Sequence, residues 1–394
     1  MSSNQPLEIS VTRDQVAAFR LSQHHLLERA PKKALLSVAD HMTGAQAQLL
    51  SAAQLSLWSR IRDLELKHIE DAFRKRMLVK ASGMRRTLFL FPSEHLAVFV
   101  RGSARRAEKE YNWARKQGVP ERVLDAAIEA ALGVLDEPLT RPEIAERACR
   151  ALGVQIRFAK GGGWGSQREL ASVPVGDLTY PVVYLLHLAA SRGIVCYGPN
   201  QGNQPTFVRA DAWISNWKDV PQEQAEGLLL RRYLRAFGPA TAADFAMWTG
   251  ISQREAQQIW AREESDFTTV NVNGWTGIVL GEDVRKLMKA EFERSHVRLL
   301  SYFDTYLLGH KDRNHLVALE HRGKIYRPQG WIAPVVLLNG RVVAVWRYTI
   351  EKDRLHVTVE KLEPISKQVA AGIREEAQDL ARFLGASDVD VQTK

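Results

Sequence analysis

The chain has 394 residues, a length that is too great for one ordinary domain and predicts roughly two to four. Apolar residues make up 45% of the sequence, enough for real hydrophobic cores, and no long polar tract indicates disorder. Lys and Arg outnumber Asp and Glu by 54 to 45, a net charge of +9 that favours nucleic acid as partner, then an acidic membrane surface. A generically basic protein is the alternative.

The first hundred residues predict three helices followed by a strand. Apolar residues recur at helical spacing over residues 12–27, 40–61 and 66–79, the last with a basic outer face. Residues 86–92 then read as a short strand closed by proline. Three helices followed by strands are the outline of a winged-helix unit.

A second unit begins near Val119, with a helix predicted over residues 121–132. The next helix has a strong start, because Thr140 can cap it, Pro142 lies in its first turn and Glu143 completes a capping-box spacing. A helix over residues 181–191 and a strand over residues 193–197 follow.

A third unit repeats this scheme from Ala225. A helix capped by Thr241 ends at Gly250, and a second helix runs from Ser252 to Trp260, which together form a helix-turn-helix signature. From His296 onward strands dominate, and a final helix follows. We expect strands at residues 316–319, 332–338, 342–349 and 355–359, a hairpin turn at Asn339-Gly340 and a helix at 365–384.

These elements predict an α+β protein made of three tandem winged-helix domains and a small C-terminal β domain. The expected boundaries are residues 1–115, 116–222, 223–295 and 296–394. The two cysteines, Cys149 and Cys196, provide neither a disulfide framework nor a thiolate metal site. The N-terminus lacks the pattern of a secretory signal, and the longest apolar run is far too short to span a bilayer. We therefore expect a cytoplasmic, bacterial-type protein without membrane contact.

The first candidate for chemistry is Gly44-Ala45-Gln46-Ala47-Gln48, where two glutamines bracket one small residue. In a regular helix, positions i and i+2 point about 200° apart. Both amides therefore meet one substrate only if this segment is a turn or a helix start, which Gly44 favours. Two polar residues on a helix surface are the alternative.

Two basic clusters are candidates for contacts with DNA phosphates, which position a protein without reading bases. The first cluster contains no acidic residue, and in the second Arg101 and Arg105 lie at i, i+4 on one helical face. The predicted DNA-binding residues are Arg74, Arg76, Lys80, Arg85, Arg86, Arg101 and Arg105. A solvated helix face is the alternative for both clusters.

Other motifs give no support for further chemistry. The glycine-rich residues 161–165 lack the Gly-Lys-Ser/Thr ending of a phosphate loop, so a wing or crossing loop is expected. His310, His315 and His321 lack a recognised metal-ligand spacing and are expected at the surface. No nucleophilic hydrolase constellation is present. We expect no metal and no cofactor.

Several short motifs, in order over roughly residues 10 to 360, resemble the bacterial AlkZ-like winged-helix DNA glycosylases. Besides residues 44–48, they are Arg86-Thr87-Leu88, Pro92-Ser93-Glu94, Leu139-Thr140-Arg141, Gly238-Pro239-Ala240-Thr241, Asp244-Phe245-Ala246-Met247-Trp248, Leu299-Leu300-Ser301-Tyr302-Phe303-Asp304, Asn339-Gly340-Arg341-Val342 and Trp346-Arg347. The family's Gln-apolar-Gln motif falls on Gln46, Ala47 and Gln48, so the resemblance implies Gln46 and Gln48 as catalytic residues.

The resemblance also implies a C-shaped DNA-binding channel and hydrolysis of the N-glycosidic bond of alkylated purines, chiefly N7-alkylguanine. The expected partner is double-stranded DNA carrying alkylated purines, bound by a monomer located at the nucleoid. Some members unhook interstrand crosslinks or bulky adducts, in certain cases as self-resistance to DNA-alkylating antibiotics. Some relatives carry a His-apolar-His motif, which this chain lacks, so crosslink processing stays open. A non-catalytic winged-helix regulator, or a resistance protein that sequesters adducts, is the alternative function.

Overall fold

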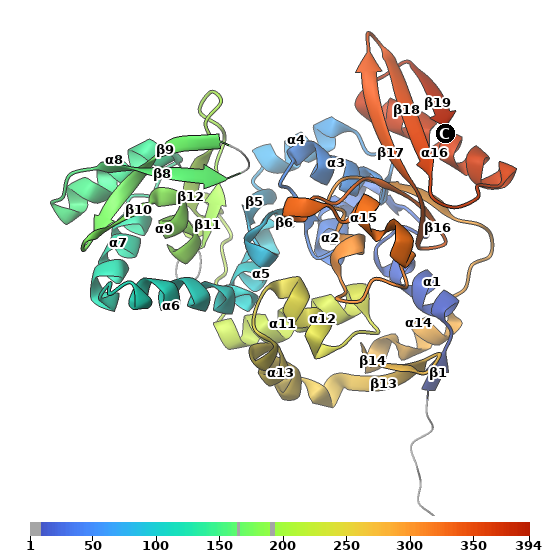
Figure 1. Ribbon diagram of the computed structural model, residues 1–394, viewed down its shortest axis with the longest axis horizontal. Helices are drawn as coiled ribbons and strands as arrows, with labels where there is room; N and C mark the ends of the chain where they lie inside the picture. The colour runs from blue at the N-terminus through green and yellow to red at the C-terminus, as the bar shows by residue number, and fades with distance from the viewer. Residues whose placement is uncertain (1–8, 164–165, 190–193) are drawn as a thin grey trace, which may run out of the picture.

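The computed structural model describes residues 9–163, 166–189 and 194–394, with side chains for all of these except 108–110, 161–163 and 166–168. The chain folds as a mixed α+β protein (Figure 1). A smaller lobe, built around α6–α9 and β8–β10, projects from a larger body that contains both the first and the last elements of the chain. No helix in these described ranges is long and apolar enough to cross a membrane.

The first hundred residues form short helices alternating with short strands. In chain order these are β1 (Ile9–Val11), α1 (Arg13–Gln23), β2 (Ala30–Pro31), α2 (Leu35–His41), β3 (Ala45–Gln46), α3 (Leu50–Trp58), β4 (Ile61–Arg62), α4 (Leu66–Arg74), β5 (Leu78–Ser82), the 3₁₀ turn η2 (Met84–Arg86), β6 (Leu88–Pro92) and α5 (Leu96–Gly102). The prediction of one helix over residues 40–61 is wrong, since β3 interrupts it. The predicted strand at 86–92 is confirmed as β6.

The second group of elements consists of α6 (Glu108–Lys116), α7 (Glu121–Gly133), β7 (Leu139–Thr140), α8 (Arg141–Leu152), β8 (Arg157–Gly163), β9 (Ser166–Val175), β10 (Leu178–Pro181), α9 (Val182–Ala189), β11 (Val195–Tyr197), β12 (Thr206–Arg209) and α10 (Ala210–Trp213). The three predicted helices and the predicted strand of this region are found as α7, α8, α9 and β11, and the other elements were not predicted. Thr140 caps α8 in a capping box with Glu143, as predicted. β8 and β9 pair on both sides of the glycine-rich segment, whose Trp164 and Gly165 lie outside the described residues.

The third group contains the predicted helix pair. Its elements are α11 (Gln222–Phe237), α12 (Ala242–Thr249), α13 (Gln253–Arg262), β13 (Phe267–Val272), β14 (Trp275–Leu280) and α14 (Val284–Lys289). Thr241 and Ser252 cap α12 and α13, and Gly250 ends α12 at a φ of +87°. A left-handed conformation at this position favours glycine. The helix-turn-helix prediction is therefore confirmed.

The C-terminal elements form a five-stranded sheet covered by one long helix. They are β15 (Val297–Leu300), the 3₁₀ turn η7 (Thr305–Leu308), α15 (Arg322–Ile325), β16 (Val335–Leu338), β17 (Arg341–Glu351), β18 (Arg354–Lys361), α16 (Lys367–Leu384) and β19 (Asp388–Thr393), in the sheet order β15-β16-β17-β18-β19. The strand predicted at 316–319 is wrong. Leu316 and Val317 lie in a turn, and their side chains are buried. The short apolar run therefore predicted burial correctly but not the backbone conformation.

Two features of the fold connect segments that are distant in sequence. A six-stranded sheet in the order β3-β6-β5-β11-β12-β7 joins strands of the body to strands of the second group. One hydrophobic core contains residues 30–90 together with residues 297–383, including Trp58 beside Phe383 of α16. The division into units at residues 115, 222 and 295 remains a prediction.

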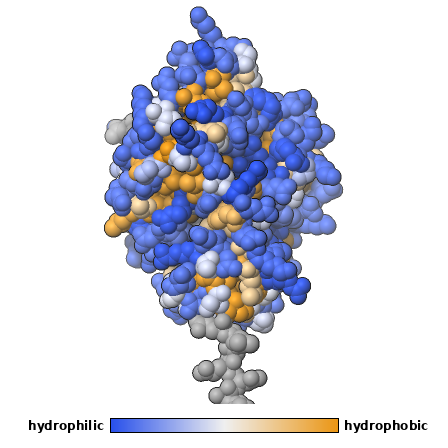
Figure 2. All heavy atoms as spheres, turned by 90° about the vertical axis from the view of Figure 1, so that its right-hand side faces the viewer, coloured by the Kyte–Doolittle hydropathy of each residue, from blue (hydrophilic) through white to orange (hydrophobic). Residues whose placement is uncertain are grey.

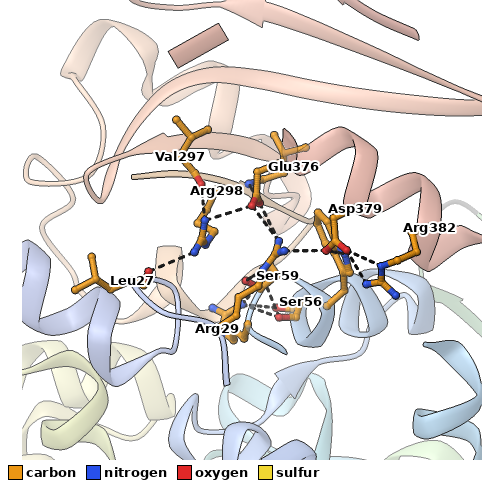
Figure 3. A network of polar contacts seen from close by, with 12 residues as sticks. Leu27, Arg29, Ser56, Ser59, Val297, Arg298, Glu376, Asp379 and Arg382 are labelled. Carbon is orange, nitrogen blue, oxygen red and sulfur yellow. Dashed lines mark hydrogen bonds and ion pairs between the residues drawn. The ribbon is translucent and has the colours of Figure 1, made fainter. Parts of the chain in front are cut away.

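Ion pairs reinforce the contact between α16 and the first hundred residues (Figure 3). Arg29 contacts Glu376 at 3.0 Å and Asp379 at 2.8 Å, and Arg298 contacts Glu376 at 3.3 Å. Burial raises the pKa of Glu376, and the two guanidinium groups oppose that shift. Hydrophilic residues cover most of the face seen in Figure 2, with apolar residues in smaller patches between them.

Candidate active site

The segment that carries the two glutamines is an extended strand end and not a helix. Helix α2 ends in a turn at Thr43 and Gly44, after which Ala45 and Gln46 pair antiparallel with Leu90 and Phe89 of β6. The ladder continues one residue further, since the Ala47 amide donates to the Leu88 carbonyl at 2.6 Å. The expectation that residues 44–48 are not a helix interior is confirmed.

Gly44 is required at this turn for two reasons. Its φ is +86°, a conformation that residues with a Cβ rarely adopt, and a Cβ placed there would lie 2.5 Å from the Phe91 ring. Phe91 stacks between Phe89 and Phe99 in the buried core behind the strand, so it has little room to move. The path of the chain into Gln46 therefore depends on the absence of a side chain at position 44.

We expect Gly44→Ala to lower the free energy of unfolding by about 2 to 4 kcal/mol. The loss has two causes, because the alanine would adopt a strained φ and its methyl group would clash with the Phe91 ring. Gly118→Ala is the matched control, because Gly118 also has a positive φ (+78°) but nothing lies within 4 Å of an added Cβ. Chemical denaturation of both variants measures the difference. Equal losses would show that Phe91 accommodates the methyl group.

Gln46 is the last residue of β3, and Gln48 lies two residues further on, in the bend before α3. Side chains alternate along a strand, so residues i and i+2 share a face. The burial pattern agrees with this geometry: Ala45 and Ala47 are fully buried, whereas Gln46 is 6% exposed and Gln48 is partly exposed. The segment therefore combines a strand end with a bend that leads into α3, so Gln48 lies next to the helix start that the sequence led us to expect.

Arg85 lies against the first of these amides. It donates to the backbone carbonyl of Trp248 at 2.6 Å and, at a longer 3.4 Å, to Oε1 of Gln46. Its backbone has a φ of +53° and packs closely against Gly250 at the end of α12. Burial, and secondarily the charge of Arg313, lower the pKa of Arg85 to about 10, so the group stays protonated at neutral pH. Arg85 thus fixes the carbonyl oxygen of Gln46 and leaves its NH₂ group to face elsewhere.

Comparison with known proteins decides the family. A model of the DNA glycosylase AlkZ-like family matches residues 39–383, which is most of the chain. The protein belongs to the AlkZ-like DNA glycosylase family. It is 30% identical over 389 residues to the interstrand DNA cross-link repair glycosylase of Streptomyces sahachiroi, over 96% of this chain and 98% of that protein.

The structural comparison agrees with the sequence comparison. The fold is similar to the solved structure of Streptomyces sahachiroi DNA glycosylase AlkZ, with a TM-score of 0.80 and 28% identity over 98% of this chain and 100% of that one. The resemblance seen in the sequence motifs is therefore confirmed, as are the mixed α+β fold and the assignment of this chain as a DNA glycosylase.

The side chains of the first basic cluster of the glycosylase differ in exposure and in their contacts with other residues. Arg74 is highly exposed and contacts Asp71, while Arg76 lies over the Trp213 ring at 3.6 Å and donates to the Trp213 carbonyl. Lys80 lies over the Tyr197 ring at 5.1 Å, and burial lowers its pKa. Aromatic contacts of this kind orient a cation without neutralising its charge.

Of the remaining basic candidates, Arg101 and Arg105 contact carboxylates. Arg86 is exposed on the same turn as Arg85. Arg101 forms a two-pronged contact with Asp219, and Arg105 forms one with the buried Glu226. A DNA phosphate would have to displace these carboxylates to bind either arginine. These long-range pairs gave no signal in the local sequence, and phosphate binding by Arg101 and Arg105 stays a prediction.

Two histidine groups differ from what the sequence indicated. His310 is 4% exposed and donates from Nε2 to the Phe237 carbonyl, so its expected surface position is wrong; desolvation lowers its pKa well below the usual value. A stacked pair at the turn before the glutamines was not foreseen. His25 Nε2 lies 2.8 Å from His41 Nδ1, and burial lowers the pKa of both rings, that of His25 to about 4.

A buried acid beside the second histidine was also missed. Asp40 precedes His41 in α2 and contacts His95 at 2.9 Å and Arg232 at 3.0 Å. These contacts outweigh the desolvation of the carboxyl group and keep its pKa below the usual value. Since His95 and Arg232 come from distant parts of the sequence, spacing along the chain could not reveal the group.

We expect Arg85→Gln to lower the maximal single-turnover rate of the glycosylase about tenfold while leaving the half-saturating enzyme concentration nearly unchanged. A residue that only orients a catalytic group affects the transition state and not DNA binding. Arg74→Gln, which removes the same charge from an exposed site, is the control and should change binding alone. A weaker affinity with an unchanged maximal rate in Arg85→Gln would instead indicate that Arg85 contacts DNA.

Proposed function

We propose that this glycosylase is monofunctional and hydrolyses the N-glycosidic bond of N7-alkylated purines, with Gln46 and Gln48 positioning the water. The observation that supports this proposal best is the pair of neutral amides at the end of β3 and in the bend directly after it. Among the residues described by the structure, neither amide is hydrogen-bonded to a carboxylate.

Neutral amides suit a substrate that is already activated. A glutamine side chain does not titrate in the useful range, so it cannot serve as a general base. An N7-alkylated guanine is cationic, its glycosidic bond is weakened, and the base leaves as a neutral group. Such a reaction needs an oriented water and a stabilised oxocarbenium-like sugar more than strong proton abstraction. An undamaged purine lacks this activation and would not react.

The contact with Arg85 suggests that the two amides have different roles. Because Arg85 occupies Oε1 of Gln46, the NH₂ group of Gln46 is the part left to donate toward substrate or water. Gln48 has no hydrogen bond of its side chain to any described residue, so its carbonyl oxygen is available to accept from the water. One amide would donate and the other would accept.

We infer that three winged-helix domains and the C-terminal β domain form a C-shaped channel around duplex DNA. Exposed cations, including Arg74, Arg76 and Arg86, would contact phosphates there. A crosslinked base is tied to both strands and cannot rotate out of the duplex, so base flipping is not required. The relative from Streptomyces sahachiroi is an interstrand cross-link repair glycosylase, which supports crosslinks as one substrate class.

A base-release assay tests this proposal directly. The protein is incubated with duplex oligonucleotides carrying one 7-methylguanine or one nitrogen-mustard crosslink, and abasic sites are then cleaved with alkali. We expect alkali-dependent strand breaks at the 7-methylguanine and none at unmodified guanine. DNA binding without base release would contradict the proposal and would favour the alternative of a protein that sequesters adducts.

A further inference from the structure

A cavity of about 710 Å³ lies on the larger body. Its walls come from α1, the first turn of α12, the segment around residues 306–315 and the hairpin turn between β16 and β17. Neither Gln46 nor Gln48 lines it. The volume falls within the range of sites that hold small organic ligands, which is about 300 to 1,000 Å³.

Positive charge predominates on the cavity walls. The lining cations are Arg13, Arg20, Lys311, Arg322 and Arg341. The lining carboxylates are Asp14, Asp244 and Asp312. The Asp244 carboxylate accepts hydrogen bonds from Thr241, at the cap of α12, and from the Lys311 backbone amide. Asp312 accepts from Arg322 and Asn314. Two of the three carboxylates therefore already have partners within the protein.

Four of these cations have no carboxylate partner within ion-pair distance among the described residues. Arg13, Lys311 and Arg341 are exposed at the cavity. Arg20 is only 5% exposed and donates to the carbonyls of Gly238 and Pro239, which carry no charge. A buried charge is costly unless it is paired. The arrangement therefore favours an anion in the cavity.

An unpartnered imidazole provides a second, independent observation. His315 lines the cavity, and its Nε2 is buried without a hydrogen-bond partner among the described residues. The neighbouring His310 ring lies edge-on at 4.7 Å, and its Nδ1 is likewise unpartnered. Buried polar atoms are seldom left without partners. Burial, and secondarily the charges of the lining arginines, hold the pKa of His315 well below the usual value.

We propose that this cavity binds the phosphate of a nucleotide unit, with the guanidinium groups of Arg13 and Arg341 and the ammonium group of Lys311 around the phosphate. Trp275 lines the same cavity and is 41% exposed, which leaves its ring available to stack on the base. Guanidinium groups match phosphate oxygens in geometry as well as charge.

Helix α12 relates this cavity to the glutamine motif. Asp244 in its first turn lines the cavity, and the Trp248 carbonyl near its end accepts from Arg85, which holds Gln46. Asp244 and Trp248 are four residues apart, which corresponds to about 6 Å along the helix. The nucleotide unit therefore has two sources, a free nucleotide or a unit of DNA bound at the glycosylase site. The second source rests on the proposed function.

The test compares two variants that each remove two exposed positive charges. Arg13→Gln/Arg341→Gln removes them from the cavity, and Lys367→Gln/Arg374→Gln removes them from α16 as a matched control. Calorimetric titration with deoxyguanosine monophosphate and with inorganic phosphate measures binding of free ligand. Titration of duplex DNA over a range of salt concentrations measures the number of phosphates contacted.

We expect the nucleotide to bind the native protein with one-to-one stoichiometry, more tightly than inorganic phosphate, and about tenfold more weakly to the cavity variant only. If the nucleotide does not bind, a fall of about 2 in the DNA salt slope of the cavity variant alone would assign the site to bound DNA. The proposal is overturned if neither effect occurs, or if both variants behave alike. The nucleotide titration needs no base release, so a protein without glycosylase activity would still test it.

Discussion

We expect Gln46→Ala and Gln48→Ala each to lower the rate of 7-methylguanine release by about 10²-fold or more, because each would remove one of the two groups that we propose orient the water. Single-turnover rates on the alkylated duplex measure the effect. Both side chains lie outside the hydrophobic core that holds Ala45 and Ala47, so melting temperatures should change little. DNA affinity should also remain within a few fold of the native protein.

The glutamate variants separate the roles of the two amides. Gln46→Glu loses the NH₂ donor and gains a carboxylate that pairs with Arg85, so we expect nearly the same loss as in Gln46→Ala. Gln48→Glu keeps an acceptor oxygen and should retain clearly more activity than Gln48→Ala. The reverse order, with Gln46→Glu the more active enzyme, would contradict the proposed division between donor and acceptor.

Asp304→Ala destabilises the protein by about 3 to 5 kcal/mol, because it leaves the Arg60 guanidinium buried without its partner. Both side chains of this ion pair are fully buried, at 2.7 Å, and Asp304 also accepts from the Ser56 hydroxyl and the Tyr306 amide. The pair connects the end of α3 to the segment after β15. Denaturant unfolding followed by circular dichroism measures the change.

A surface ion pair provides the control for this substitution. Asp388 contacts Arg354 at 2.9 Å, but both side chains are more than half exposed, and such pairs contribute about 0 to 1 kcal/mol. We therefore expect Asp388→Ala to be nearly neutral. Equal stabilities of the two variants would show that the buried pair is replaced by solvent or rearranged.

Local signals in the sequence were sufficient for several elements. Capping residues act within one turn, so the starts of α8, α12 and α13 at Thr140, Thr241 and Ser252 were predicted correctly. The Gln-apolar-Gln motif identified the candidate site for the same reason, since its residues are contiguous. The family was recognised from ordered motifs along the whole chain, and the family model confirms it.

Features that depend on distant partners could not be predicted. Strand β3 forms because residues 88–90 present backbone groups to it, so spacing alone suggested a helix there. Arg85 was predicted as a phosphate contact, while its observed partners, Gln46 and Trp248, lie 39 and 163 residues away. The pairs that engage Arg101 and Arg105 involve separations of 118 and 121 residues.

The shared core of residues 30–90 and 297–383 determines when this protein folds during its synthesis. Ala45 and Ala47, which flank Gln46, belong to the same core as Phe383 of α16. Ribosomes add about 5 to 20 residues per second, so about 20 to 70 s separate the synthesis of the glutamines from that of their packing partners. We therefore expect this part of the core to remain without its C-terminal packing partners until α16 has been synthesised.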